Sequence, residues 1–230
     1  MVYAFDFHVH THCSPDCRMK VPQIAARAMK LGFAGLAITD HETVLGAFEM
    51  RDYVKKNNLQ LRVIIGQEKK TKQGEILALF IKKRITADNV ADAIEQVRAQ
   101  DGLVVLPHPF RNNPQLFQLA GLFDFVEVFN SRTNAQRNGR AIEFAHRNNL
   151  KPIAGSDAHL LFELGCARVY FNSLKDIKGQ LMRSEYELVY QQRHELSILL
   201  AKLATATVKG GFLYASKKLL TMLVDKTKNL

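Results

Sequence analysis

Short apolar runs alternate with stretches of helical periodicity along most of the 230-residue chain, and this alternation limits the possible folds more than any other feature. The apolar runs cover residues 3–7, 34–39, 61–66, 75–81, 103–106, 123–129, 152–154 and 168–171. Helical spacing lies between them, for example over residues 21–31, 88–100 and 135–148. Strand, helix and strand in repeated order predict parallel strands joined by crossover helices. Because the runs are continuously apolar, we expect a sheet covered on both faces, either a barrel or an open doubly wound sheet.

The last part of the chain has a different composition. Residues 196–230 contain six lysines and one aspartate. Their net charge of +5 is half of the net charge of +10 of the whole chain. Two apolar stripes at helical spacing flank Gly210-Gly211, namely Leu196, Leu199, Leu200 and Leu203, then Phe212, Leu213, Leu219, Leu220 and Leu223. We therefore expect a barrel domain over residues 1–185 and a basic helical extension over residues 186–230 that packs on it. Contact of this extension with a membrane surface or with nucleic acid remains an alternative.

Several classes of protein are excluded. No run of 18 uncharged apolar residues is present, which argues against a transmembrane helix, and the first residues lack the pattern of a signal peptide. Three cysteines are too few for a disulfide framework and indicate reduced thiols in the cytoplasm. The basic balance suggests an anionic partner: a phosphorylated small molecule or nucleotide, a nucleic acid or a membrane surface.

Potential metal ligands follow five of the predicted strands. In chain order they are His8 and His10, His41, Glu68, His108, and Asp157 with His159. The carboxyl ends of parallel strands face one side of a sheet or barrel, so these side chains should converge. Imidazole with carboxylate favours Zn²⁺, Mn²⁺ or Fe²⁺. Because so many ligands exceed the needs of one ion, we expect two or three divalent ions with a bridging carboxylate.

The motifs that carry these ligands resemble those of the PHP (polymerase and histidinol phosphatase) family. They are DFHVHTHCSPD at residues 6–16, ITDHET at 38–43, GQE at 66–68, LPHP at 106–109 and GSDAH at 155–159, in the family's order. The resemblance covers about residues 3–185. It implies a distorted TIM-like (β/α)7 barrel, with a two- or three-metal site at the carboxyl ends of the strands and phosphoester hydrolysis as the usual activity.

The resemblance also implies how the ligands are shared among the ions. His8, His10, Glu68 and Asp157 would hold one ion, and Glu68 would bridge to a second ion that His108 also binds. The third ion would be held by Asp16, His41 and His159. Many family members have a further histidine in the extended run after the glutamate, which here reads GEILAL at residues 74–79. Glu75 could replace that histidine, but such a residue is more often a surface charge, so we expect a second ion that is weakly held, exchangeable or absent.

The predicted reaction is hydrolysis of a phosphoester by hydroxide generated at the metal ions, which makes the protein an enzyme. We expect Glu68, His41 and His159 to be catalytic, the two histidines as ligands that also handle protons. Arg111, Arg132 and Asn130 follow predicted strands on the same rim and are candidates for binding substrate. An exonuclease that trims RNA or DNA ends is the first alternative, and a non-catalytic or membrane-peripheral module with a vestigial site is the second.

Overall fold

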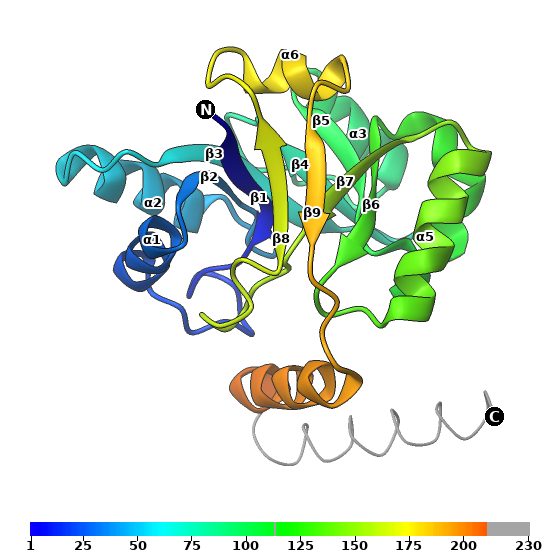
Figure 1. The fold of residues 1–230 in the computed structure, drawn as a ribbon. Coiled ribbons are helices and arrows are strands. Elements are labelled where there is room, and N and C mark those ends of the chain that lie inside the picture. The colour runs from blue at the N-terminus through cyan, green and yellow to red at the C-terminus, as the bar shows by residue number, and fades with distance from the viewer. Residues whose placement is uncertain (113, 211–230) are drawn as a thin grey trace.

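The computed structural model of the protein describes residues 1–112 and 114–210, and nine of its strands form one sheet that curves into a nearly closed barrel (Figure 1). The strand order is β7-β6-β5-β4-β3-β2-β1-β8-β9. The strands are β1 (Tyr3–Val9), β2 (Phe33–Ile38), β3 (Arg62–Lys70), β4 (Glu75–Leu79), β5 (Leu103–Leu106), β6 (Phe125–Asn130), β7 (Lys151–Gly155), β8 (Ala167–Phe171) and β9 (Glu187–Tyr190). A bridge between Val9 and Ala158 joins the end of β1 to the segment after β7. The α/β barrel expected from the sequence is confirmed, with nine strands in place of seven.

The strands are not all parallel, and here the sequence prediction is wrong. The groups β1-β2-β3 and β5-β6-β7 are parallel, whereas β4 runs antiparallel to both of its neighbours. β8 is antiparallel to β1, and β9 to β8. Only residues 71–74 separate β3 from β4, and a parallel crossover needs about a dozen residues, so this pair can form only a hairpin.

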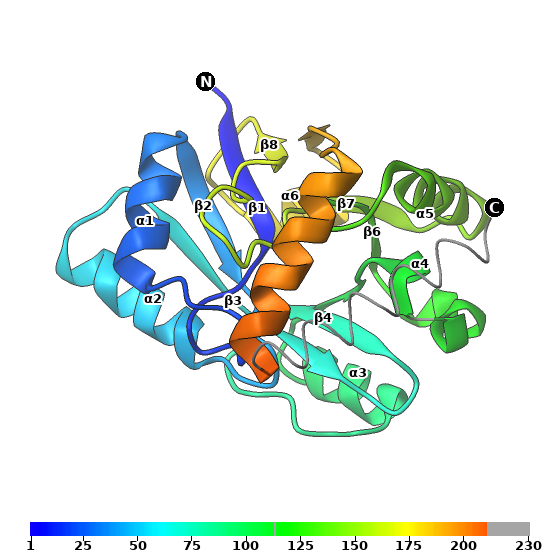
Figure 2. The same ribbon diagram turned by 90° about the horizontal axis from the view of Figure 1, so that it is seen from below.

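Helices cover the outside of most of the barrel. They are α1 (Val21–Lys30), α2 (Leu45–Lys56), α3 (Val90–Arg98), α4 (Pro109–Asn112), the 3-10 helix η1 (Pro114–Leu122), α5 (Ala135–Arg147) and α6 (Ile177–Met182). α1 and α2 lie on one side, and α3 and α5 lie on the other (Figures 1 and 2). Each packs a stripe of apolar residues against the sheet, as Ile24, Ala25 and Ala28 of α1 do.

The interior of the barrel is filled by large side chains at alternate strand positions. Phe5 and Phe171 meet edge to face with ring centroids 5.4 Å apart, and Phe7 and Phe125 are also fully buried. A Cβ on Gly35 would lie 2.1 Å from the Phe5 ring, so this packing requires glycine in β2. The core therefore fills the barrel beneath the carboxyl ends of the strands, and its close packing holds these strand ends in place.

The chain continues past the barrel into a helix. β9 extends the sheet to Tyr190, beyond residue 185, and residues 195–210 form a helix at the opposite end of the barrel from α6 (Figure 1). The predicted stripe at Leu196 and Leu200 is not its buried face, because these side chains are 56% and 58% exposed. The second predicted stripe, residues 212–223, lies outside the described residues. None of the helices in residues 1–112 and 114–210 is long and apolar enough to cross a membrane.

Candidate metal centre

The potential ligands converge at the carboxyl end of the barrel, as the sequence predicts. His8 lies inside β1 and Glu68 inside β3, so neither simply follows its strand. His41 pairs with Glu68 through an isolated bridge, which brings the end of β2 to β3. His108 and Asp157 follow β5 and β7 and have positive φ angles of 27° and 53°. Such angles are uncommon outside glycine. Here they mark turns at which the chain leaves a strand, and each turn directs the side chain of a potential metal ligand towards the carboxyl end of the barrel.

Four side chains form the most compact group. The Nε2 atoms of His8 and His10 are 3.1 Å apart, and both face Glu68 Oε2, at 3.4 and 3.3 Å. Asp157 Oδ1 completes the group, 3.7 Å from His8 Nε2 and 3.3 Å from His10 Nε2. A tetrahedral ion with ligand bonds of about 2.0–2.2 Å has ligand atoms about 3.3–3.6 Å apart. These four residues therefore fit a single divalent ion.

A second group shares Glu68 with the first. The other oxygen of this carboxylate, Oε1, lies 2.9 Å from His108 Nε2, and Glu75 Oε2 lies 3.9 Å from the same nitrogen. Glu68 stands opposite Leu77 in the hairpin, and Glu75 is two residues before Leu77, so both glutamates point to the same face. Glu68 thus has the geometry of a bridge between two ions. Glu75 belongs to this cluster of potential ligands, and its ordinary interpretation as a surface charge does not describe its position.

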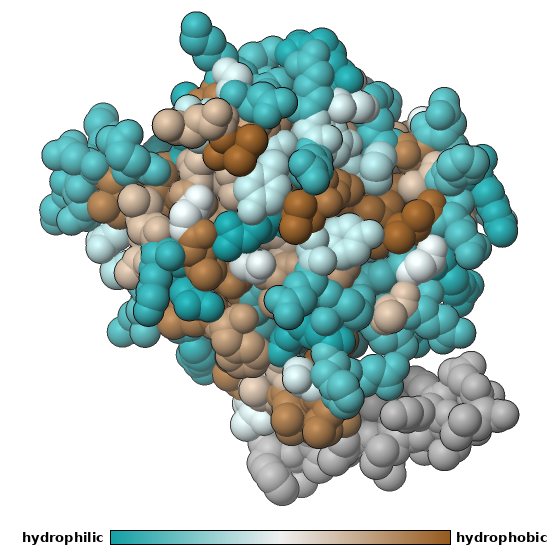
Figure 3. Space-filling model, in the orientation of Figure 1, coloured by the Kyte–Doolittle hydropathy of each residue, from teal (hydrophilic) through white to brown (hydrophobic). Residues whose placement is uncertain are grey.

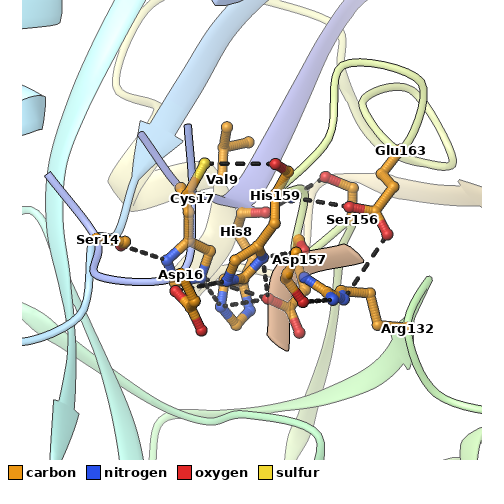
Figure 4. Close-up of polar contacts among 12 residues, drawn as sticks. His8, Val9, Ser14, Asp16, Cys17, Arg132, Ser156, Asp157, His159 and Glu163 are labelled. Carbon is orange, nitrogen blue, oxygen red and sulfur yellow. Dashed lines mark hydrogen bonds and ion pairs between the residues drawn. The ribbon is translucent and has the colours of Figure 1, made fainter. Parts of the chain in front are cut away.

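The third group lies nearer to the mouth. Asp16 joins two histidines, with Oδ2 3.5 Å from His41 Nε2 and Oδ1 3.3 Å from His159 Nε2. The ring of His10 stacks on that of His159 with centroids 4.1 Å apart, so this group adjoins the first. Figure 4 shows His8, Asp157 and His159 turned towards one another, with Asp16 beside them. All eight ligands predicted from the sequence are therefore brought together.

The charges of the site suit a cation. Burial opposes protonation of His10, but the neighbouring carboxylates of Asp157 and Glu68 outweigh it and raise the pKa of His10 to about 9. Burial also opposes ionisation of Glu68, but the charges of His41 and His8 hold the pKa of its carboxyl well below its usual range. Asp157 Oδ1 and Asp16 Oδ1 are buried with no hydrogen-bond partner among the described residues. Ionised, unsatisfied carboxylate oxygens beside imidazole nitrogens are the donor set expected of a divalent metal site.

Glu127 supports the site and was not identified from the sequence. Its Oε1 lies 2.9 Å from His8 Nδ1, and its Oε2 accepts hydrogen bonds from the backbone N–H of His108 and from Asn130 Nδ2. A carboxylate on the second ring nitrogen fixes the tautomer and orientation of a metal-binding histidine. The available signal was a charged residue in the centre of an apolar strand, residues 125–130, which is rare unless the charge has a partner.

Ser14 and Asp40 support the neighbouring ligand in the same way. Ser14 Oγ lies 3.0 Å from His10 Nδ1 and donates to Asp40 Oδ1 at 2.8 Å. Asp40 also accepts from the backbone and the hydroxyl of Thr11, which orders the loop after β1. A Cβ on Gly46 would lie 2.0 Å from Asp40 Oδ2, so the second residue of α2 must be glycine.

The three candidate substrate-binding residues have different surroundings. Arg111 donates to Asp157 Oδ2 at 2.7 Å and retains 18% exposure of its side chain. Asn130 is fully buried and donates to Glu127 and Asp157, so it positions other site residues. Arg132 lies on the rim but is 4% exposed, and its guanidinium contacts Glu163 and the helix at residues 195–210 (Figure 4). The described contacts of Arg132 are thus to the protein itself.

Comparison with known proteins agrees with this geometry. The model of the PHP domain family matches residues 6–226. The chain belongs to the PHP domain family. Two uncharacterised proteins of Methanocaldococcus jannaschii are similar: MJ0417, 36% identical over 48% of this chain and 52% of its own, and MJ1587, 33% identical over 55% and 81%. This chain therefore matches only about half the length of MJ0417.

A solved structure shows the same fold. It is the crystal structure of a two-domain protein from Bacteroides vulgatus ATCC 8482 that contains a predicted PHP-like metal-dependent phosphoesterase. It superposes with a TM-score of 0.69 at 19% identity, over 83% of this chain and 65% of that one. At this identity the likeness extends to the PHP fold and not to the substrate.

Proposed function

We propose that this PHP chain is a metal-dependent phosphoesterase that hydrolyses a phosphoester of a small phosphorylated metabolite or nucleotide. The observation that carries the proposal is the position of Glu68, whose two oxygens face two different sets of ligands. Oε2 faces His8 and His10, and Oε1 faces His108. A carboxylate that bridges two ions would hold them close together, which is the arrangement used in two-metal hydrolysis of phosphoesters.

In this proposal, three groups of residues would hold the ions. His8, His10, Glu68 and Asp157 would hold the first, and Glu68, Glu75 and His108 the second. Asp16, His41 and His159 would hold the third. Imidazole with carboxylate suits Mn²⁺, Zn²⁺ or Fe²⁺. Such ions lower the pKa of a water molecule to about 7 and neutralise phosphate charge.

The chain's own residues would position the substrate and move protons. His41 lies at the mouth with 23% of its side chain exposed, and His159 lies across Asp16 from it. We assign proton transfer at the leaving oxygen to these two histidines. Arg111 has five N–H donors and directs one nitrogen at Asp157, so its remaining donors can contact a phosphate oxygen.

Metal analysis combined with activity assays tests this function. Purified protein is loaded with Mn²⁺, Zn²⁺, Fe²⁺ or Mg²⁺ and assayed with p-nitrophenyl phosphate, nucleoside bisphosphates and labelled oligonucleotides. We expect hydrolysis of the small phosphoesters and at least two ions per chain. Glu68→Gln should lose metal and reduce activity by about 100-fold or more, since it removes the bridge. Glu143→Gln, on the exposed face of α5, is the matched control and should change neither.

The outcomes separate the alternatives. Trimming of oligonucleotide ends as the only activity would favour the exonuclease. Less than one ion per chain, with no hydrolysis after addition of any of the four metals, would contradict the proposed enzymatic activity. The non-catalytic binding module would then be the remaining hypothesis.

A further inference from the structure

The helix formed by residues 195–210 crosses the mouth of the barrel. In Figure 1 it lies beyond the carboxyl end of β1, and in the view from below it passes in front of the barrel opening (Figure 2). This is the same end of the barrel that carries the metal ligands. The helix therefore lies over the end of the barrel that carries the site.

One face of this helix is turned towards the protein. Ile198, Ala201, Thr205 and Ala206 are at most 5% exposed, whereas Leu196 and Leu200 point outward. Ile198, Ala201 and Thr205 are spaced by three and four residues, and Ala206 follows Thr205 directly, which places the buried positions on one side of the helix. Figure 3 shows hydrophobic residues on the outer surface of this helix, at the bottom of the view.

Hydrogen bonds and an ion pair hold this helix against the loops around the site. Arg132 Nη2 donates to Ala201 O at 3.3 Å and to Thr205 Oγ1 at 2.7 Å. Arg193, just before the helix, pairs with Glu163 Oε1 at 2.9 Å. Glu163 is fully buried, and its Oε2 accepts the backbone N–H of His159 at 2.9 Å. A single carboxylate thus links the helix to the loop that carries a metal ligand.

Lys202 lies on the inward face of this helix. It follows Ala201 and is three and four residues before Thr205 and Ala206, which are buried. Burial, and then the positive charges of Arg111 and Arg132, lower the pKa of Lys202 to about 7. No acidic side chain of the described residues forms an ion pair with it, although the charge of Asp157 also reaches it. Lys202 is four residues from both Ile198 and Ala206, which are buried, and is itself partly buried, so its side chain leaves the helix on the face turned towards the protein, where an amine is a suitable anion ligand.

We propose that Lys202 binds the phosphate of the substrate, so that the C-terminal helix forms one wall of the active site and supplies a cation opposite the metal ligands. The proposal rests on the phosphoesterase function above and assigns it a further binding residue. The anion would lie between the Lys202 amine and the exposed part of Arg111. Its charge would relieve the repulsion between these two cations, which gives phosphate a binding site that a neutral molecule lacks.

Binding of inorganic phosphate to the Mn²⁺-loaded full chain, measured by calorimetry, tests this role without requiring turnover. Lys202→Met keeps the apolar stem and removes the charge, and should weaken phosphate binding by about tenfold or more. Lys202→Arg should restore it to within about threefold of the wild type, since the charge returns. Lys209→Met is the matched control, because Lys209 is exposed on the same helix, and it should bind phosphate as the wild type does.

Metal content and thermal melting accompany each variant, and both should be unchanged. If Lys202→Met melts early, Lys202→Gln replaces it as the uncharged variant. Phosphate binding by the uncharged variant equal to that of Lys209→Met would overturn the assignment. If the wild type hydrolyses no phosphoester but phosphate binding still requires Lys202, the anion site stands and the proposed function fails. If hydrolysis occurs and the variants bind alike, the function stands and the role of Lys202 fails.

Discussion

Glu163 should be among the most important residues for stability, although it is neither a predicted metal ligand nor part of a PHP motif. Its carboxylate is fully buried and meets Arg193 at 2.9 Å and Arg132 Nε at 3.7 Å. It also accepts the backbone N–H groups of His159 and Leu160, at 2.9 and 3.0 Å. Glu163→Ala would leave two nearly buried guanidinium groups without their counter-ion and two N–H groups without an acceptor.

The size of the effect follows from these contacts. Removing one partner of a buried ion pair costs about 3–5 kcal/mol, because the remaining charge stays buried without compensation. For a chain of this size about 1 kcal/mol corresponds to about 2–4 °C in Tm, so the expected fall is about 6–20 °C. The melt is followed by circular dichroism, with urea unfolding as a second measure of the free energy of unfolding.

The control is Glu143→Ala, which removes an exposed i,i+4 pair with Arg147 at 3.4 Å. Such a pair contributes less than about 0.5 kcal/mol, so Tm should shift by no more than about 2 °C. Metal content should fall in Glu163→Ala but not in the control, since the His159 loop loses its anchor. If Glu163→Ala costs less than about 1 kcal/mol, the two arginines reach water or another acceptor, and the reasoning is refuted.

Four further predictions concern the site and its surroundings. Glu75→Gln should weaken one metal equivalent by about tenfold or more in calorimetry with Mn²⁺ and leave the tightest equivalent unchanged, because a charged potential ligand is lost. Gly155→Ala should lower both Tm and metal content, since a Cβ there would lie 2.4 Å from the side chain of His8. Gly139→Ala, where a Cβ meets nothing within 4 Å on α5, should instead stabilise by about 1 kcal/mol, and a fall in its Tm would contradict the helix-propensity argument. Burial raises the pKa of the Cys17 thiol to about 12, so at pH 8 it is protonated and should resist alkylation until the protein unfolds; rapid modification of the native protein, mapped by mass spectrometry, would disprove its burial.

The sequence alone predicted an α/β sheet from its alternating pattern, the barrel from its resemblance to the PHP family, and the residues of the candidate metal site. Ligand residues after successive apolar runs must meet at one end of a parallel sheet, because the strand direction places them there. This reasoning needs no knowledge of how the helices pack. It predicted His8, His10, His41, Glu68, His108, Asp157 and His159. The resemblance to the PHP family added Asp16, and the structure brings all eight together. The antiparallel direction of β4 could also have been predicted from the sequence, because the connection of residues 71–74 is too short for a parallel crossover.

Only the tertiary structure decided how the remaining charged residues are used. Arg132 and Glu163 are far apart in sequence from the helix at residues 195–210, and no local pattern predicts that they fasten it. The leucine stripe at 196 and 200 indicated the wrong face, because hydrophobic periodicity shows that a helix is amphipathic but not what lies opposite it. The face turned towards the protein instead carries Ile198, Ala201, Thr205 and Ala206, which are at most 5% exposed. Hydrogen bonds from Arg132 and the ion pair between Arg193 and Glu163 join residues far apart in sequence, and only the tertiary structure shows that they hold this helix in place.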